Sequence, residues 1–510
     1  TIQDVIVARI DKLDEETKKL LKVASVIGRT FFYKILSQVA DDVEGINEKL
    51  AYLKEAQLIR EREKMGEVAY LFKHGLIHEA AYELILRNQR KELHLKVARA
   101  IESVFSDKIH SFYGILAYHY SNGENMDRTE QYLLKAGEEA LRSSASIEAL
   151  NYYQEGLRLY LRKYGDAADP EKIATFEKNI ALAFFNKGQH ENALRHFDRV
   201  LERWGLETPK GWISMRFRLI SNLLNVILNL YFPRRGTGRR PAERDNEIFE
   251  LSYKRAMALV HLDPRRCFVE FLSILRRLRH FEIAETDNGI GIWMSASGLF
   301  SWSGISFRLS EKILAYTRPM LDQEDLRHRL YYHLFELIHL SLKGEWSRIG
   351  EYDQDLVDSG LKVGEHWHVL NYLLFHGFIK IEEGDFEEAD RIVRTLSDIW
   401  ETYGNENAIA TQRFLRLRIF VVQRSLNRAL AEAEAAIRES EKGRPSVIYY
   451  SGYKAIVQIL LDDLEGANRS LEQSKAFISE RGRVPPIFMS SYFMGELCYY
   501  LHFLENAVLS

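Results

Sequence analysis

The sequence predicts an all-α protein, a long array of helical hairpins that follows a small module with both helices and strands. Three observations lead to this prediction. The 510 residues include only 9 prolines, so few helix breakers interrupt the chain. From about residue 110 onward, helical periodicity and short turns alternate without interruption. Before that point, two short alternating runs around a glycine-containing turn indicate a β-hairpin.

Composition is that of an ordinary globular protein, with 46% hydrophobic and 28% charged residues. The net charge of −3 gives no overall attraction to nucleic acid or to acidic membranes. Cys267 and Cys498 form neither a disulfide framework nor a zinc cluster, which fits a reducing cytosol. We therefore expect a cytoplasmic protein. Because the chain starts at Thr1 without a signal-peptide pattern, we expect a fragment whose catalytic domains lie elsewhere.

Residues 1–75 are predicted to form a winged-helix-like module. Asp14 is a favourable helix N-cap, acidic residues follow it in the first turn, and Gly28 is a typical stop. Three short helices followed by a β-hairpin is the element order of a winged helix. The expected helices cover residues 14–26, about 33–40 and about 43–56, and the expected strands cover 58–62 and 68–72.

The rest of the chain is divided by its repeat character. We expect connecting helices over 76–110, tetratricopeptide-like repeats over 111–205 and degenerate helical repeats over 206–510. Small residues are expected where the two helices of a pair cross, and a glycine where the chain turns between them. The predicted repeat-packing residues are Ala181, Gly188 and Ala193 in one pair, and Gly377, Gly384 and Ala389 in another. Such an array forms a degenerate solenoid in which stability comes from stacking.

One segment is long enough to span a bilayer without a charged side chain, namely Asn288–Phe307. It contains four glycines and several serines, and it has no aromatic belt at both ends. Small residues let helices pack closely. The segment is therefore predicted to be a buried helix of the solenoid.

The basic stretch 233–244 is predicted to be an exposed loop, because it is rich in Pro, Gly and Arg. A solvated insertion and a binding patch for an acidic partner are the two interpretations. The first is favoured because no aromatic residues alternate with the arginines to stack on bases.

The sequence predicts no catalytic, cofactor-binding or metal-binding residues. It has no phosphate-binding P-loop motif, and His78–Tyr82 lacks the second ligand of the zinc-protease helix. In principle His74, His78 and Glu79 can hold a metal, but capping or interdomain hydrogen bonding is the favoured interpretation. His366 and His368 are expected on different sides of a helix, and Cys267 is expected to be inert.

The first 160 residues resemble a known family. Residues 1–31 look like the segment that follows the ATPase core in large bacterial class III adenylate and guanylate cyclases, which combine a cyclase domain, a STAND-type (AAA-like) ATPase, a winged helix and tetratricopeptide repeats. Residues 70–102 and 116–141 match the following segments of that family. The signature residues, to which the resemblance gives a structural role, are Phe72, His74, Glu79, Tyr82, Arg90, Leu93 and His94.

The resemblance implies a non-catalytic regulatory and sensor region. It implies a protein or peptide bound in the repeat groove and an upstream nucleotide-binding domain as partners, with ATP and Mg needed only in upstream domains. We expect no membrane partner, and nucleic acid is not favoured, because the third predicted helix is balanced in charge. The alternatives are a transcription regulator that binds DNA through the winged helix, and the regulatory region of a multidomain protein kinase.

Overall fold

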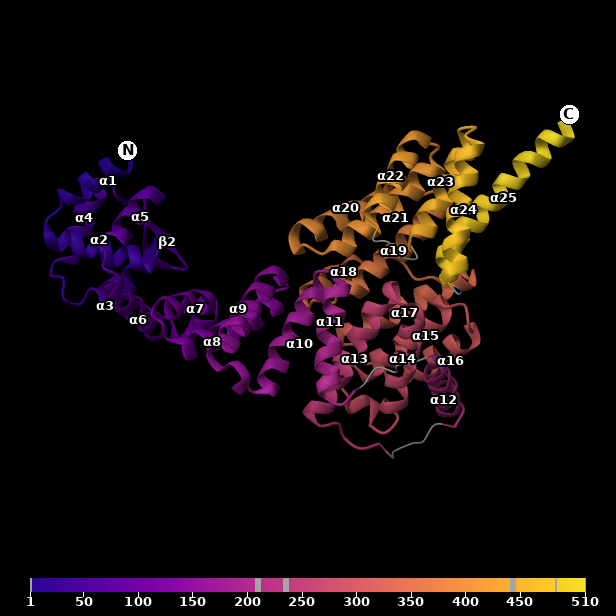
Figure 1. The fold of residues 1–510 in the computed structure, drawn as a ribbon, viewed down its shortest axis with the longest axis horizontal. Coiled ribbons are helices and arrows are strands. Elements are labelled where there is room, and N and C mark those ends of the chain that lie inside the picture. Colours follow the sequence, from indigo (N-terminus) through magenta and orange to yellow (C-terminus); the bar gives the residue numbers. More distant parts are fainter. Residues whose placement is uncertain (1, 207–211, 233–237, 441–445, 482–483, 510) are drawn as a thin grey trace. The chain divides into compact units, whose positions relative to one another are not determined.

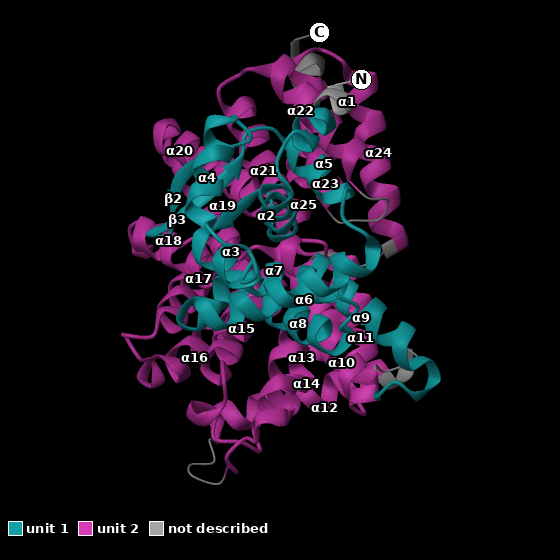
Figure 2. Cartoon of the chain, turned by 90° about the vertical axis from the view of Figure 1, so that its left-hand side faces the viewer, with its two compact units in different colours: residues 1–140, 151–169 teal, residues 141–150, 170–510 magenta. Residues whose placement is uncertain are grey.

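The structure, a computed structural model, describes residues 2–206, 212–232, 238–440, 446–481 and 484–509. These residues form 25 α-helices and one three-stranded sheet, so the predicted all-α fold with a small α+β module is confirmed (Figure 1). The chain divides into two compact units (Figure 2). Unit 1 comprises residues 1–140 and 151–169, and unit 2 comprises residues 141–150 and 170–510.

Unit 1 begins with helices whose ends follow the predicted signals. The Asp14 carboxylate accepts a hydrogen bond from the Thr17 backbone N–H at 2.9 Å, and Gly28, with φ +140°, follows the last turn. The helices of this part of the chain are α1 (Ile2–Asp11), α2 (Glu15–Ile27), α3 (Tyr33–Val39), α4 (Ile46–Glu55), α5 (Gly75–Glu83), α6 (Arg87–Val104), α7 (Tyr113–Asn122), α8 (Met126–Arg142) and α9 (Ser146–Tyr164).

The sheet contains one strand more than the predicted hairpin. Strands β2 (Ile59–Lys64) and β3 (Glu67–Phe72) form the hairpin, and β1 (Thr30–Phe32) pairs antiparallel with the other edge of β3. Because β1 has only three residues, its sequence shows no alternation that predicts a strand. The element order is therefore helix, strand, helix, helix, strand, strand, with sheet order β1-β3-β2.

A single hydrophobic core joins the sheet to the helices expected to act as connectors. The core runs from Ile6 to Leu133 and includes Leu159. Helices α5 and α6 pack on α2, and α6 also packs on α3. The boundary predicted at residue 75 therefore does not separate two cores in this structure.

Unit 2 is an array of antiparallel helical pairs. Sequence neighbours such as α10 and α11, or α19 and α20, pack together, and α19, α21, α23 and α25 follow one another in a second line of contacts. Its helices are α10 (Pro170–Asn186), α11 (His190–Arg203), α12 (Trp212–Tyr231), α13 (Glu243–Leu262), α14 (Pro264–Leu278), α15 (Gly289–Trp302), α16 (Phe307–Thr317), α17 (Leu326–Lys343), α18 (Gln354–Lys362), α19 (His366–Glu383), α20 (Phe386–Tyr403), α21 (Glu406–Val422), α22 (Leu426–Glu439), α23 (Ser446–Leu460), α24 (Leu464–Arg481) and α25 (Pro486–Leu509).

The uncharged segment forms α15, which is buried along its length from Gly289 to Ser301. A Cβ on Gly291 would lie 2.7 Å from the Tyr331 ring, and a Cβ on Gly298 would lie 2.4 Å from the Phe335 ring. Because glycine has no Cβ, α17 can approach α15 this closely. The prediction of a buried helix is confirmed for α15, whereas Gly304 and Ile305, in the turn that follows, are exposed. Among the residues that the structure describes, no helix is long and apolar enough to span a bilayer.

Where it is described, the basic stretch is exposed as predicted, at Arg239, Arg240 and Arg244, but its arginines also contact other parts of unit 2. Residues 233–237 lie outside the described residues, and α13 already begins at Glu243. The Arg239 guanidinium lies 4.3 Å from the Phe281 ring, and the Arg244 guanidinium lies 3.6 Å from the Trp204 ring. Arg239 also pairs with Asp245, and Arg244 with Glu171. The aromatic partners come from distant parts of the chain, so local sequence does not show them.

The predicted repeat-packing residues belong to two helical hairpins, α10–α11 and α19–α20. Ala181, Ala193 and Ala389 are fully buried, and Gly188 and Gly384 both have φ +78° at turns between paired helices. A Cβ on Gly377 would lie 2.5 Å from a methyl carbon of Leu415, which is itself fully buried. Gly377 therefore allows α19 and α21 to pack closely.

Gly377→Ala is expected to lower the free energy of unfolding of unit 2 by roughly 1–3 kcal/mol, because the added methyl group overpacks a closed contact. The matched control is Gly350→Ala, since no atom lies within 4 Å of a Cβ built there. Urea denaturation followed by tryptophan fluorescence measures both changes. Equal stability of the two variants would contradict the close-packing role of Gly377.

Candidate functional site: a groove over α21

The turn between α10 and α11 docks on the start of α21, far away in sequence. Asn405 Nδ2 donates to the Asn186 carbonyl at 2.8 Å, across 219 residues of chain. The Glu406 N–H donates to the Lys187 carbonyl at 2.9 Å. A plain solenoid makes contacts only between neighbouring repeats, so these bonds add a constraint that stacking alone lacks.

A glycine and a histidine in this turn complete the docking contact. A Cβ on Gly188 would lie 2.9 Å from the backbone nitrogen of Asn407, so the residue provides close approach as well as its positive φ. The side-chain amide of Asn407 lies 2.8 Å from His190 Nε2. Gly188 was predicted only as a turn residue, because the sequence does not show that Asn407 lies against it.

A groove runs over α21 from this contact. One hollow, of about 560 Å³, has α21 as its floor and α20 and α22 as its walls. A second, of about 520 Å³, extends to the docked turn. The two share Trp400, Ile409 and Arg413, so they form one continuous depression, which we call the α21 groove. The residues that line its central part are Ser397, Trp400, Glu401, Ile409, Gln412, Arg413, Arg416, Phe420, Arg428, Ala431, Glu432 and Ala435.

Charged groups of both signs line the α21 groove. Arg413 Nη2 lies 2.8 Å from Glu439, and Arg416 Nη2 lies 3.1 Å from Glu432. The Arg428 guanidinium lies 4.1 Å from the Phe420 ring. Paired in this way, the side chains are held in place while part of each remains accessible, which suits recognition of polar and charged groups.

Apolar surface and open space accompany these charges. The Trp400 side chain is 38% exposed at the rim that both hollows share. Ala431 and Ala435 face the central part from α22 and, being small, leave the groove open. Tryptophan and arginine are the residues most enriched at the energetic centres of protein interfaces. The groove therefore combines residue types that are common at protein interfaces with open space between its walls.

Among the described residues, no group of three or more His, Cys, Asp or Glu side chains is placed to hold a metal ion. His366 and His368 contact different partners: the His366 ring lies 4.8 Å from Tyr403, whereas His368 Nδ1 lies 2.9 Å from Glu365. Cys267 is fully buried, and burial raises the pKa of its thiol.

The signature residues of unit 1 are only partly brought together. The Tyr82 hydroxyl lies 2.9 Å from His94 Nε2, and the Arg90 guanidinium lies 4.6 Å from the Tyr82 ring. Phe72 is buried in the core, and Leu93 packs against it. This cluster ties α5 to α6.

The other signature positions lie apart from that cluster. His74 and Glu79 are exposed, and the His74 side chain makes no capping hydrogen bond to α5, which differs from the capping interpretation. His78, a third candidate, bonds through Nε2 to the Ser25 carbonyl at 2.9 Å. These positions thus form no single site.

A buried histidine pair extends the Tyr82 cluster. His94 Nδ1 and His119 Nδ1 lie 2.8 Å apart, so one donates and the other accepts. Burial, together with Arg90, lowers the pKa of His94 to about 4, and burial, together with His94, lowers the pKa of His119 to about 3. Sequence reasoning identified His94 but missed His119, which nothing in the local pattern distinguishes.

Comparisons with known proteins identify no family. No protein-family model matches the chain. An uncharacterized protein of Rhizobium meliloti (strain 1021) is 32% identical over 94 residues, which are 18% of this chain and 9% of that protein. The chain therefore spans a small fraction of that relative's length.

A crystal structure of a Signal Transduction ATPase with Numerous Domains (STAND) protein with a tetratricopeptide repeat sensor, from Pyrococcus horikoshii, aligns with 94% of this chain and 66% of its own. The sequences are 14% identical and the TM-score is 0.26. The alignment leaves about a third of that structure uncovered, and the likeness carries no conclusion about this chain.

The histidine pair predicts an acid-sensitive unit 1. Above the unfolded-state pKa of about 6.5, both rings are neutral in either state and stability is complete. As the pH falls below that value, only the unfolded chain takes up protons, so stability falls until the folded pKa values near 4 and 3 are reached. Between pH 7 and pH 5, the free energy of unfolding of unit 1 is expected to fall by roughly 2–4 kcal/mol less in the double variant His94→Gln, His119→Gln than in the unsubstituted chain.

Urea-dependent hydrogen exchange in α6 and α7, compared at pH 7 and pH 5, measures this loss. The single variant His280→Gln, at an exposed position of unit 2, serves as a control that keeps the pair. If the double variant retains the full pH dependence of the unsubstituted chain, the pair is not the acid-sensitive element.

Proposed function

We propose that this chain is a non-catalytic regulatory region that binds a protein or peptide segment in the α21 groove. The observation that supports this proposal is the continuous groove itself, with a half-exposed tryptophan and held arginines along an open floor. An extended or helical segment placed there would cover Trp400 while its polar groups meet Arg413 and Arg416. Aromatic and arginine anchors of this kind provide most of the binding energy at protein interfaces.

The resemblance of the first 160 residues supports a more specific setting. We propose that the parent is a STAND-type ATPase signalling protein, with a nucleotide cyclase as the output domain, and that ATP and Mg bind in its upstream domains. The regulatory region of a protein kinase is the alternative parent. The helix-strand-helix-helix-strand-strand order of residues 15–72 supports a winged-helix module, which would pack on the upstream nucleotide-binding domain.

A regulatory role requires that occupancy of the groove changes a conformational equilibrium. A ligand shifts that equilibrium only by its difference in affinity for the two states. The groove includes the docked α10–α11 turn, so a ligand that contacts both segments would favour the docked state.

DNA binding through α4 has little support from the charges around it. Lys54 on α4 pairs with Glu61 on β2 at 2.7 Å, and Lys34 on α3 pairs with Glu67 on β3 at 2.7 Å. Phosphate contacts need cations that are not already neutralised. A salt-dependent mobility shift of DNA by the full chain would support this alternative.

Peptides selected from a random phage-displayed library against the 510-residue chain provide the probe. Trp400→Ala is expected to weaken their binding by about tenfold or more, since loss of a central tryptophan anchor typically costs 2 kcal/mol or more. Fluorescence anisotropy with the selected peptides measures the change.

Trp346→Ala is the matched control, because Trp346 is similarly exposed, at 44%, but does not line the groove. Binding that depends on Trp400 and not on Trp346 supports the proposal. Failure to select any peptide, or equal loss in the two variants, would argue against the groove as the binding site.

A further inference from the structure

Helix α12 turns a stripe of large apolar side chains towards solvent. The helix packs on α14 at the edge of unit 2 (Figure 1). Its outward stripe recurs at helical spacing, with members three or four residues apart. The exposed fractions are 73% for Phe217, 59% for Ile220, 56% for Leu224, 57% for Leu228 and 55% for Tyr231, and Phe232, directly after the helix, is 73% exposed.

Polar residues, by contrast, help to attach the helix to the rest of the unit. The Asn222 amide donates to Ser273 Oγ at 2.7 Å, and Arg279 donates to Asn225 Oδ1 at 2.6 Å. Val226 and Leu230 supply the buried apolar part of this contact. A surface helix normally has polar residues on its outward side, whereas α12 has large apolar residues there as well as on its buried side.

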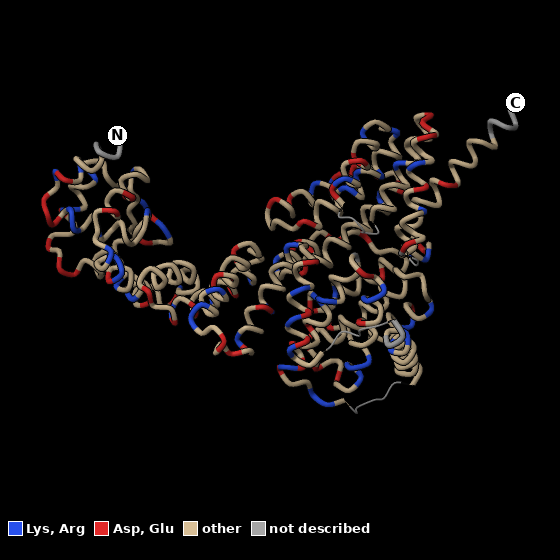
Figure 3. Tube along the Cα trace, in the orientation of Figure 1, with Lys and Arg blue, Asp and Glu red and all other residues tan. Residues whose placement is uncertain are grey.

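Cations flank the stripe, and the helix contains no acidic residue. At 100° per residue, Arg216 and Arg218 lie on opposite sides of the line through Phe217, Leu224 and Leu228, and both are exposed. The ammonium group of Lys312 lies 4.3 Å from the Tyr231 ring at the other end. Arg216 and Arg218 are the charged residues of α12 itself. In Figure 3 the helix is accordingly mostly tan, with blue as its only charge colour.

We propose that the outward face of α12 binds the surface of an anionic lipid bilayer, with the helix lying in the plane of the interface. Exposed Phe, Leu and Tyr side chains flanked by arginines are the features of such helices. Anionic headgroups attract clustered cations. The net charge of −3, which led to the expectation of no membrane partner, averages over 510 residues and hides this local excess.

Charge favours a lipid surface over a second copy of the chain. If a large side chain exposes about 150–250 Å² when free, these six expose on the order of 600–900 Å². That area is comparable with the roughly 800 Å² that each partner contributes to a stable protein interface, so charge has to decide between the two. In an α12–α12 pair, no acidic side chain of either helix would face the arginines. A bilayer, in contrast, supplies negative charge along the whole helix.

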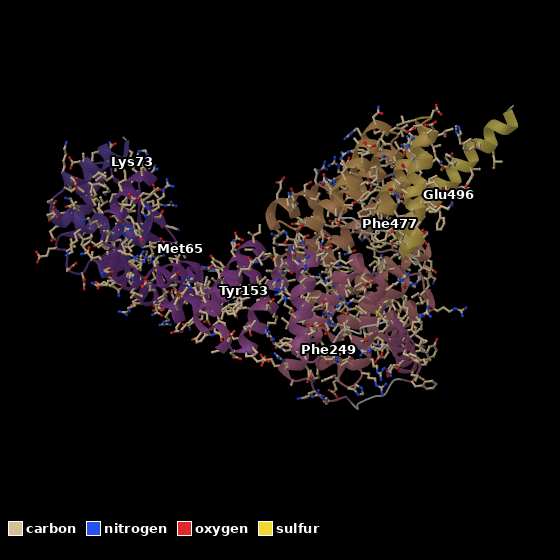
Figure 4. The ribbon with its side chains drawn as sticks, in the orientation of Figure 1. Met65, Lys73, Tyr153, Phe249, Phe477 and Glu496 are labelled. Carbon is tan, nitrogen blue, oxygen red and sulfur yellow. The ribbon has the colours of Figure 1, made fainter. Side chains whose placement is uncertain are left out.

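Helix α25 provides a matched comparison. Met494, Leu497 and Leu504 are exposed in a similar stripe, but the helix contains Glu496 and no Lys or Arg (Figure 4). It therefore presents comparable apolar surface without the cationic flanks, and anionic lipid should not select it.

Co-sedimentation of the 510-residue chain with vesicles tests the proposal. One vesicle population contains phosphatidylcholine alone, and the other contains about a third phosphatidylserine. The variants are Ile220→Ser, Leu224→Ser and Leu228→Ser together, and Arg216→Glu with Arg218→Glu. The control is Met494→Ser, Leu497→Ser and Leu504→Ser together. All substituted side chains are exposed, so folding is not the readout.

The unsubstituted chain is expected to bind the anionic vesicles and to bind the neutral vesicles poorly. High salt should weaken its binding to the anionic vesicles by at least tenfold. Both α12 variants should lose at least tenfold in binding, and the α25 variant should not. Absence of binding, equal binding to both vesicle types, or equal loss in the α25 control would overturn the proposal. A solution dimer that the α12 serine variant dissociates, without vesicle binding, would assign the face to a second copy instead.

Discussion

The docking of one helical turn on a distant helix is the constraint on which the candidate site depends. Asn405 and Glu406 bond to the carbonyls of Asn186 and Lys187, so the α10–α11 hairpin is held against α21. A repeat array without such bonds is held only by contacts between successive repeats. Here the bonds also place Gly188, Gln189 and His190 in the lining of the α21 groove. The groove therefore needs both the local stacking of α20–α22 and this long-range contact.

Local signals in the sequence predicted local structure well. Asp14 and Gly28 mark the ends of α2, small residues mark helix crossings, and the glycines of α15 indicate close packing rather than a membrane span. The caps of α2 act within that helix, whereas the glycines of α15 predict close packing without showing that α17 is the helix that approaches. The three-residue strand β1 was missed because its pairing partner β3 lies about 40 residues away and because three residues are too few to show an alternation.

The candidate site was beyond sequence reasoning because its members are distant in the chain. Trp400, Arg413 and Glu432 occupy three different helices, and none belongs to a motif with fixed spacing. The Asn407–His190 contact and the His94–His119 pair join residues that only the fold brings together. The signature residues Tyr82, Arg90 and His94, in contrast, lie close in sequence and were found together, although His74 and Glu79 remain outside their cluster.

Difference hydrogen exchange, with and without a saturating groove-selected peptide, tests most directly whether distant segments form one binding site. The account predicts added protection both in residues 397–432 of α20–α22 and in residues 187–192 of the docked turn, because both line the same depression. Protection confined to one of the two segments, or located in unit 1, would contradict it.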